Sequence, residues 1–198
     1  MDDKIKKALR VMIFSGLLLL LPSICAADAG LPMIVWVWPA MIVAMIPIIA
    51  IETIIFKHAL NAPYVKTTWA VSVANVVSTM VGYPLSWFLL LGVQILTPGG
   101  SSGFGTATLW ERIASVTAGA AWLAPHESEL YWMVPVAAMV GLIPAFLISV
   151  YLEAFLVGLF FVCERGRTII RISSNANLVT YLLLEGILVL CLVFRAFG

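Results

Sequence analysis

The chain has 198 residues, of which 63% are hydrophobic and only 11% are charged, and its formal net charge is +1. An average soluble domain carries about 25% charged residues, and a domain of this size still exposes roughly a third of its chain surface to water. The composition therefore excludes a water-soluble fold and predicts that lipid surrounds most side chains. The small net charge does not indicate a nucleic-acid partner.

Residues 1–29 have the pattern of a secretory signal peptide. Four basic residues precede the apolar run 11–21, which Pro22 closes, and Ala27-Asp28-Ala29 supplies a small-x-small cleavage pattern. A membrane-spanning helix needs about 20 apolar residues, and this run is shorter. We predict a signal peptide. The alternative is an uncleaved N-terminal membrane helix, which would be a fifth helix in addition to the four spans described next.

Four later segments are long and apolar enough to cross a bilayer. They cover residues of about 31–56, 67–90, 131–162 and 172–194. Short connections join the first to the second and the third to the fourth, which predicts antiparallel helical hairpins. The hairpins occupy about 33–96 and 131–198 within a single helical membrane domain, residues 30–198. A bend is expected at Gly82-Tyr83-Pro84, because proline interrupts helical hydrogen bonding.

The segment 97–130 between the hairpins is expected to leave the membrane. Within it an interfacial amphipathic helix is predicted, because apolar residues recur at steps of three or four. These residues are Leu109, Ile113, Val116, Ala120 and Leu123. Two tryptophans would anchor the helix in the headgroup layer, and three polar side chains would face water. The tryptophans are Trp110 and Trp122, and the polar residues are Glu111, Arg112 and Ser115.

Basic residues near the span ends predict the orientation. Five lie on one side, namely Lys57, Lys66, Arg165, Arg167 and Arg171, and two lie on the other, Arg112 and Arg195. Loops rich in lysine and arginine stay in the cytoplasm. We therefore expect both mature termini and the 97–130 loop outside the cytoplasm, and we expect a bacterial cytoplasmic (inner) membrane.

A short polar pattern occurs in both hairpins. The segment that begins at Ser72 contains Asn75 and Ser78, and the segment that begins at Ser174 contains Asn177 and Thr180. Glu52 precedes Asn75 by 23 residues, and Glu153 precedes Asn177 by 24. We interpret the hairpins as parallel internal repeats, related most simply by an axis along the membrane normal.

A carboxylate within a membrane must be paired, hydrated or protonated. We hypothesise that Glu52, Asn75, Glu153 and Asn177 meet near the repeat axis, with Ser78 and Thr180 one helical turn deeper. At least one carboxyl would then be protonated, because neighbouring buried carboxylates resist double ionisation. The cluster is either a proton or cation site or a polar clamp that fixes helix pairing.

Glu185 differs from the other two acids, because it lies in the middle of the last span and has no counterpart in the first repeat. No basic residue is expected within its reach. Two interpretations remain open: the carboxyl is protonated and hydrogen-bonded within the chain, or it contacts another protein.

Nothing in the sequence predicts catalysis or a bound metal. The G-x-S-x-G match at residues 99–103 lies in a loop rich in turn residues, whereas a nucleophile elbow needs a strand before it and a helix after it. His58 and His126 are expected on opposite sides of the membrane, and the cysteines lack C-x-x-C spacing. We expect no enzymatic activity, no cofactor and no metal.

Two functions are consistent with these features. The first is a non-enzymatic accessory or assembly subunit of a membrane complex, with another membrane protein as its partner. The alternative is a small homo-oligomeric carrier or channel that uses Glu52 and Glu153 for protons or cations. In both cases the lipid bilayer surrounds the chain, and no nucleic acid is involved.

Overall fold

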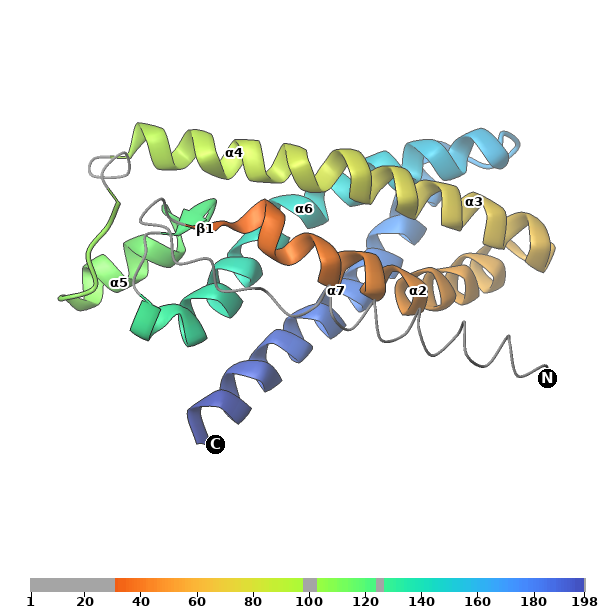
Figure 1. Ribbon diagram of the computed structural model, residues 1–198. Helices are drawn as coiled ribbons and strands as arrows, with labels where there is room; N and C mark the ends of the chain where they lie inside the picture. The colour runs from red at the N-terminus through yellow and green to blue at the C-terminus, as the bar shows by residue number, and fades with distance from the viewer. Residues whose placement is uncertain (1–30, 98–102, 124–126, 198) are drawn as a thin grey trace, which may run out of the picture.

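The computed structural model describes residues 31–97, 103–123 and 127–197, and it is almost entirely helical (Figure 1). The expected signal peptide or N-terminal helix at residues 1–29 lies outside the described residues, as do His126 and most of the G-x-S-x-G segment. Four helical spans within the described ranges are long and apolar enough to cross a membrane. This finding confirms the expected all-α fold with four helices that suit a membrane.

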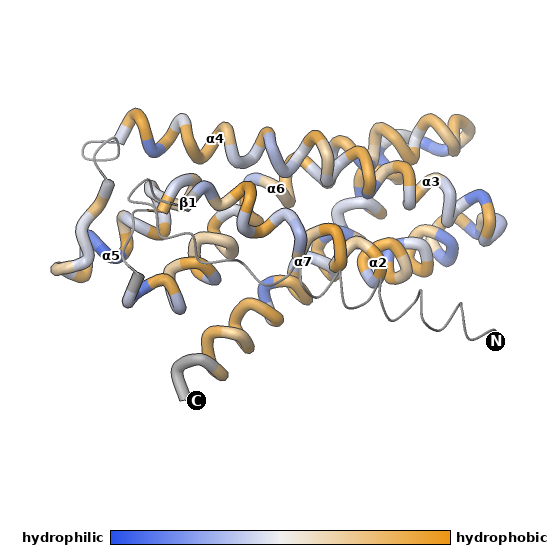
Figure 2. Tube along the Cα trace, viewed as in Figure 1, coloured by the Kyte–Doolittle hydropathy of each residue, from blue (hydrophilic) through white to orange (hydrophobic). Residues whose placement is uncertain are grey.

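Two hairpins contain these spans. In the first, α2 (Met33–Leu60) precedes a continuous helical segment formed by α3 (Tyr64–Val77), the π-helix η1 (Ser78–Gly82) and α4 (Tyr83–Leu96). In the second, α6 (Leu130–Phe160) precedes α7 (Gly166–Phe197). Figure 2 shows hydrophobic residues along the length of all four spans.

The helices extend beyond several of the span limits expected from hydropathy. The helix α2 continues to Leu60, the second span begins at Tyr64, and α7 begins at Gly166. The apolar core of a bilayer is only about 30 Å thick, so a helix can continue into the polar headgroup layer without a change in its backbone. Hydropathy therefore locates the apolar part of each helix and not its ends.

A three-residue turn closes the first hairpin. Asn61 ends α2 in the left-handed conformation, with φ 47°, and its backbone N–H donates to the carbonyl of Lys57. Asparagine tolerates this conformation better than most residues. Pro63 then precedes α3 and favours an extended approach to the new helix. The turn is short, so α2 and α3 lie side by side (Figure 1).

The hairpins pack with α3 against α6 and α2 against α7. Small buried side chains lie in the core between them and let the helix backbones approach closely. They are Ala70, Ala74, Ala154 and Ala176. Larger buried residues fill the part of this core that lies near the hairpin turns, among them Phe56, Val157 and Ile169.

Where a bend was expected near Pro84, the helix contains the π-helix η1. Pro84 has no backbone N–H and cannot donate to the carbonyl of Met80, four residues earlier. The hydrogen-bond ladder is therefore disturbed one turn before the proline, where η1 lies. Gly82 at the end of η1 approaches α6 so closely that a Cβ atom on it would lie 3.0 Å from Cγ2 of Ile148.

The segment between the hairpins folds against the other end of the bundle. It contains α5 (Leu109–Val116), whose N-terminus has a capping box formed by Thr108 and Glu111. It continues to β2 (Trp122–Leu123), which pairs antiparallel with β1 (Leu31–Pro32) before α2, and η2 (Glu127–Glu129) precedes α6. From α4, Trp87 donates to the carbonyl of Ala121, and Gln94 exchanges two hydrogen bonds with the backbone of Trp122.

The details expected for the interfacial helix were partly wrong. The helix ends at Val116, so the apolar stripe does not continue helically to Leu123. Ser115 was expected to face water but is buried, and its hydroxyl lies within hydrogen-bond distance of the carbonyls of Glu111, at 2.8 Å, and of Gly105 in the preceding loop, at 3.0 Å. Leu109 and Ile113 are exposed, and Trp110 is 79% exposed. After Val116 the chain turns and reaches β2, which pairs with β1, and helical periodicity alone does not reveal such pairing.

Candidate functional site

The first half of the site connects the two helices of the first hairpin. Glu52 on α2 is buried, and its Oε2 accepts a hydrogen bond of 2.7 Å from Nδ2 of Asn75 on α3. The second Nδ2 proton goes to the carbonyl of Val71, one turn earlier in the same helix, at 3.1 Å. The two protons of the amide would allow two hydrogen bonds to the carboxyl, but only one forms. The other proton bonds to the helix backbone and fixes the rotamer of Asn75 against α3.

The second half of the site has the same arrangement in the second hairpin. Glu153 on α6 is buried and accepts a hydrogen bond of 2.6 Å from Nδ2 of Asn177 on α7. That Nδ2 also donates to the carbonyl of Ser173, one turn earlier, at 3.1 Å. The donor, the acceptor and the intrahelical bond thus correspond to those of the first hairpin.

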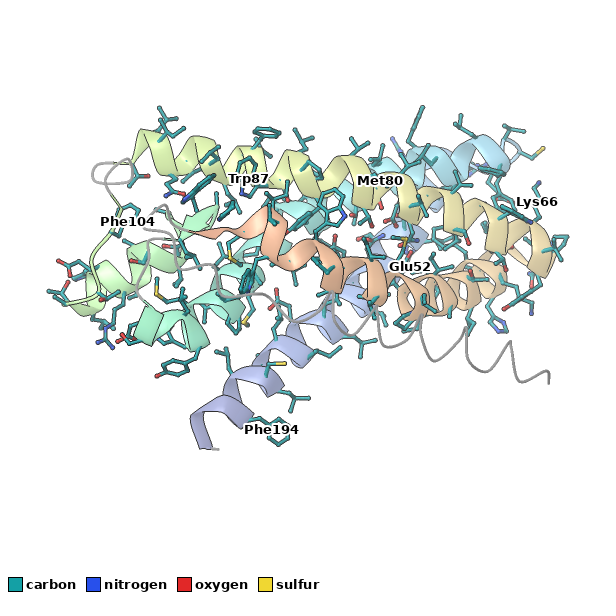
Figure 3. The ribbon with its side chains drawn as sticks, in the orientation of Figure 1. Glu52, Lys66, Met80, Trp87, Phe104 and Phe194 are labelled. Carbon is teal, nitrogen blue, oxygen red and sulfur yellow. The ribbon has the colours of Figure 1, made fainter. Side chains whose placement is uncertain are left out.

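Two hydroxyl groups cross between the hairpins. Ser78 donates to Oε1 of Glu153 at 2.6 Å, and Thr180 donates to Oε1 of Glu52 at 2.9 Å. Each carboxyl therefore accepts one bond from an asparagine of its own hairpin and one from a hydroxyl of the other hairpin. Figure 3 shows Glu52 in the interior of the bundle, where these helices meet.

The structure thus brings six of the seven predicted site residues into one hydrogen-bonded group, which we call the Glu–Asn cluster. Its members are Glu52, Asn75, Ser78, Glu153, Asn177 and Thr180, and each is at most 4% exposed. The two carboxyl groups are also close enough to interact electrostatically with each other. Within the described ranges no lysine, arginine or histidine forms an ion pair with either of them.

Two neighbouring residues belong to the surroundings of the cluster and were not predicted. Tyr181 follows Thr180, lies within electrostatic reach of both glutamates, and shares a hydrogen bond of 3.0 Å with Ser149 of α6. Thr53 follows Glu52, and its fully buried hydroxyl has no hydrogen-bond partner among the described residues. Tyr181 aligns with Thr79 of the first hairpin and Thr53 with Ala154 of the second, so neither residue is repeated and a search for repeated residues does not find them.

Glu185 lies outside the cluster. It is on the C-terminal half of α7, about 7.5 Å along the helix from Thr180 at about 1.5 Å per residue. Its carboxyl is partly exposed and has no hydrogen-bond or ion-pair partner within the described part of the chain. The corresponding position of the first hairpin holds Tyr83, whose hydroxyl donates to the carbonyl of Met33 at 3.2 Å.

The cluster is chemically suited to holding two carboxyl groups at a fixed separation and to retaining a proton between them. Its four donors come from neutral side chains, so they stabilise the carboxyls by hydrogen bonds and not by opposite charge. Across the described ranges, no group of three His, Cys, Asp or Glu residues is arranged to hold a metal ion.

No family model, curated protein or solved structure matches this chain.

Proposed function

We propose that this protein is a non-enzymatic accessory or assembly subunit of a membrane complex, and that the Glu–Asn cluster clamps its two hairpins together. The observation that carries the proposal is the reciprocal bonding of Ser78 to Glu153 and of Thr180 to Glu52. These bonds satisfy both carboxyls across the hairpin interface. Hydrogen bonds of this kind within membranes contribute about 0.6 kcal/mol each on average and up to about 2 kcal/mol.

The proposal includes an internal duplication, with hairpins at about 33–96 and 131–198. The equivalent positions of the two glutamates, the two asparagines and the two hydroxyl residues support it, as do the matching intrahelical bonds to Val71 and Ser173. The hairpins share one orientation, so the relating axis runs along the membrane normal.

The proposed orientation has the turns at residues 61–63 and 161–165 in the cytoplasm. The excess of basic residues near these turns supports it. The termini and the 97–130 loop then lie outside the cytoplasm, with residues 1–29 serving as a signal peptide, and the membrane is the bacterial inner membrane. The amphipathic α5 lies at the outer surface of that membrane.

One observation favours the second candidate function, a proton- or cation-coupled carrier. The π-helix η1 begins at Ser78, which belongs to the cluster, whereas α7 continues as a regular helix through Thr180. Helical irregularities of this kind often occur at functional sites. In a carrier, η1 would let Ser78 change its contact with Glu153 as a proton or cation binds.

The test replaces both cluster carboxyls by amides, Glu52→Gln with Glu153→Gln. Each glutamine still accepts hydrogen bonds at its amide oxygen, but a donor NH2 group replaces the second carboxyl oxygen. That NH2 group would face another donor, from a residue such as Asn75 or Thr180, so one hydrogen bond to each side chain is lost. If the cluster is a clamp, the double variant should have a lower melting temperature in detergent than the unmodified protein, and less full-length protein should be found in the membrane. The clamp also predicts that a tagged chain loses a stoichiometric membrane partner, which intact mass measurement on gently purified material detects.

The matched control is Glu164→Gln, because Glu164 is an exposed acid in the connection between α6 and α7. We expect this variant to behave like the unmodified protein. If the double variant keeps its melting temperature but loses proton-coupled flux in proteoliposomes, the clamp proposal is wrong and the carrier is supported.

A further inference from the structure

The C-terminal half of α7 leaves the helical bundle. Figure 1 shows this half pointing away from the other spans, and Figure 3 shows Phe194 at its far end. Its side chains are apolar and largely exposed, including Leu182 at 62% and Phe194 at 73%. Lipid can cover such a helix, but lipid does not satisfy the carboxyl of Glu185, which lies in its middle.

Glu185 lies well inside the apolar part of α7. It is about 14 Å along the helix from Phe194, at about 1.5 Å per residue. An ionisable side chain within a membrane usually faces a partner or a water-filled cavity, because an unsatisfied polar group in lipid is costly. The described part of the chain offers Glu185 no hydrogen bond and no cation.

The residues around Glu185 form a continuous seam along α7. Leu178, Leu182, Glu185 and Val189 follow each other at steps of four, three and four, and the three apolar members are exposed. This spacing places them on one face and suits left-handed packing against a second helix. Gly186 beside the seam has open space around it, so a second backbone can approach closely.

We propose that this seam packs against the same seam of a second copy of the chain, with Glu185 facing Glu185. In a two-fold dimer about the membrane normal, each residue on the axis meets its own copy at the same depth. A protonated carboxyl donates one hydrogen bond and accepts another, so two facing carboxyls satisfy each other.

The positions of the basic residues favour a contact between two Glu185 carboxyls over an ion pair between Glu185 and a basic residue of the second copy. Within α7, the basic residues lie near the helix ends, at Arg167, Arg171 and Arg195, and none lies near Glu185. In a parallel copy the group at the depth of Glu185 is therefore Glu185 itself. The interface does not involve the Glu–Asn cluster, so a negative test of the interface leaves the proposed clamp unaffected, and the reverse also holds.

Disulfide cross-linking of the full chain in its native membrane tests the interface. In a background with Cys25→Ser, Cys163→Ser and Cys191→Ser, we compare Val189→Cys on the seam with Ile187→Cys. Ile187 is 56% exposed, against 44% for Val189, but is rotated from Glu185 by about 200°, at 3.6 residues per turn. We expect oxidation to give covalent dimers of the Val189→Cys chain at several times the yield of the Ile187→Cys chain.

Two further variants test the role of the carboxyl. Glu185→Gln keeps a donor and an acceptor and should retain the Val189→Cys cross-link, whereas Glu185→Leu should reduce its yield several-fold. Equal yields at positions 187 and 189, absence of both cross-links, or retention of the cross-link in Glu185→Leu would overturn the proposal. An unchanged melting temperature of the Glu185→Leu monomer shows that any loss concerns the interface and not the clamp.

Discussion

At the scale of single residues, Ser78 and Thr180 connect the two hairpins. Each donates to a carboxyl of the opposite hairpin, and the contact is buried on all sides. We predict that Ser78→Ala lowers the free energy of unfolding by about 0.6–2 kcal/mol, because one acceptor of Glu153 loses its donor inside the membrane. The decrease should appear as a lower melting temperature of the purified protein in detergent.

Ser86→Ala is the matched control for this change. Ser86 is buried like Ser78, but among the described residues its hydroxyl bonds only to the carbonyl of Tyr83 in its own helix, at 2.8 Å. It should therefore have a much smaller effect than Ser78→Ala. Equal effects of the two substitutions would show that the hydroxyl of Ser78 contributes nothing specific across the hairpin interface.

At the scale of helices, the contact of η1 with α6 determines how closely the hairpins approach. An ideal Cβ on Gly82 lies 3.0 Å from Ile148, whereas a Cβ on Gly92 of α4 meets no atom within 4 Å. We predict that Gly82→Leu destabilises the protein by about 1–3 kcal/mol through overpacking. Gly92→Leu should be neutral, because its side chain extends into lipid.

Thermal denaturation of the two variants in the same detergent makes this comparison direct. Both variants replace a glycine by the same residue in the same span, so differences in hydrophobicity and helix propensity largely cancel. If Gly82→Leu melts at the temperature of Gly92→Leu, the helices separate without cost, and the close approach has no role in stability.

At the scale of the whole molecule, the orientation in the membrane determines which surfaces meet the cytoplasm. We predict that Cys163, which is exposed in the connection between α6 and α7, is protected from an impermeant maleimide added to intact cells. Ala107→Cys, in the exposed loop before α5, should react from outside when it is the only cysteine. Labelling of Cys163 without permeabilisation would reverse the proposed topology.

The sequence by itself determined the membrane class and the four spans, because transfer of apolar side chains from water to lipid depends on composition and length. It also indicated which polar residues to consider together, since Glu52, Asn75, Glu153 and Asn177 are costly in lipid unless they are paired. It did not determine the helix ends, because hydropathy is insensitive to polar turns that continue a helix beyond the bilayer core.

Only the tertiary structure decided how these polar groups pair. The crossed bonds of Ser78 and Thr180 depend on the packing of α3 against α6 and of α2 against α7, and neither hairpin contains that information alone. The pairing of β2 with β1 likewise joins positions far apart in the chain, Leu123 with Leu31 and Trp122 with Pro32. Such contacts are non-local, so periodicity within a segment cannot reveal them.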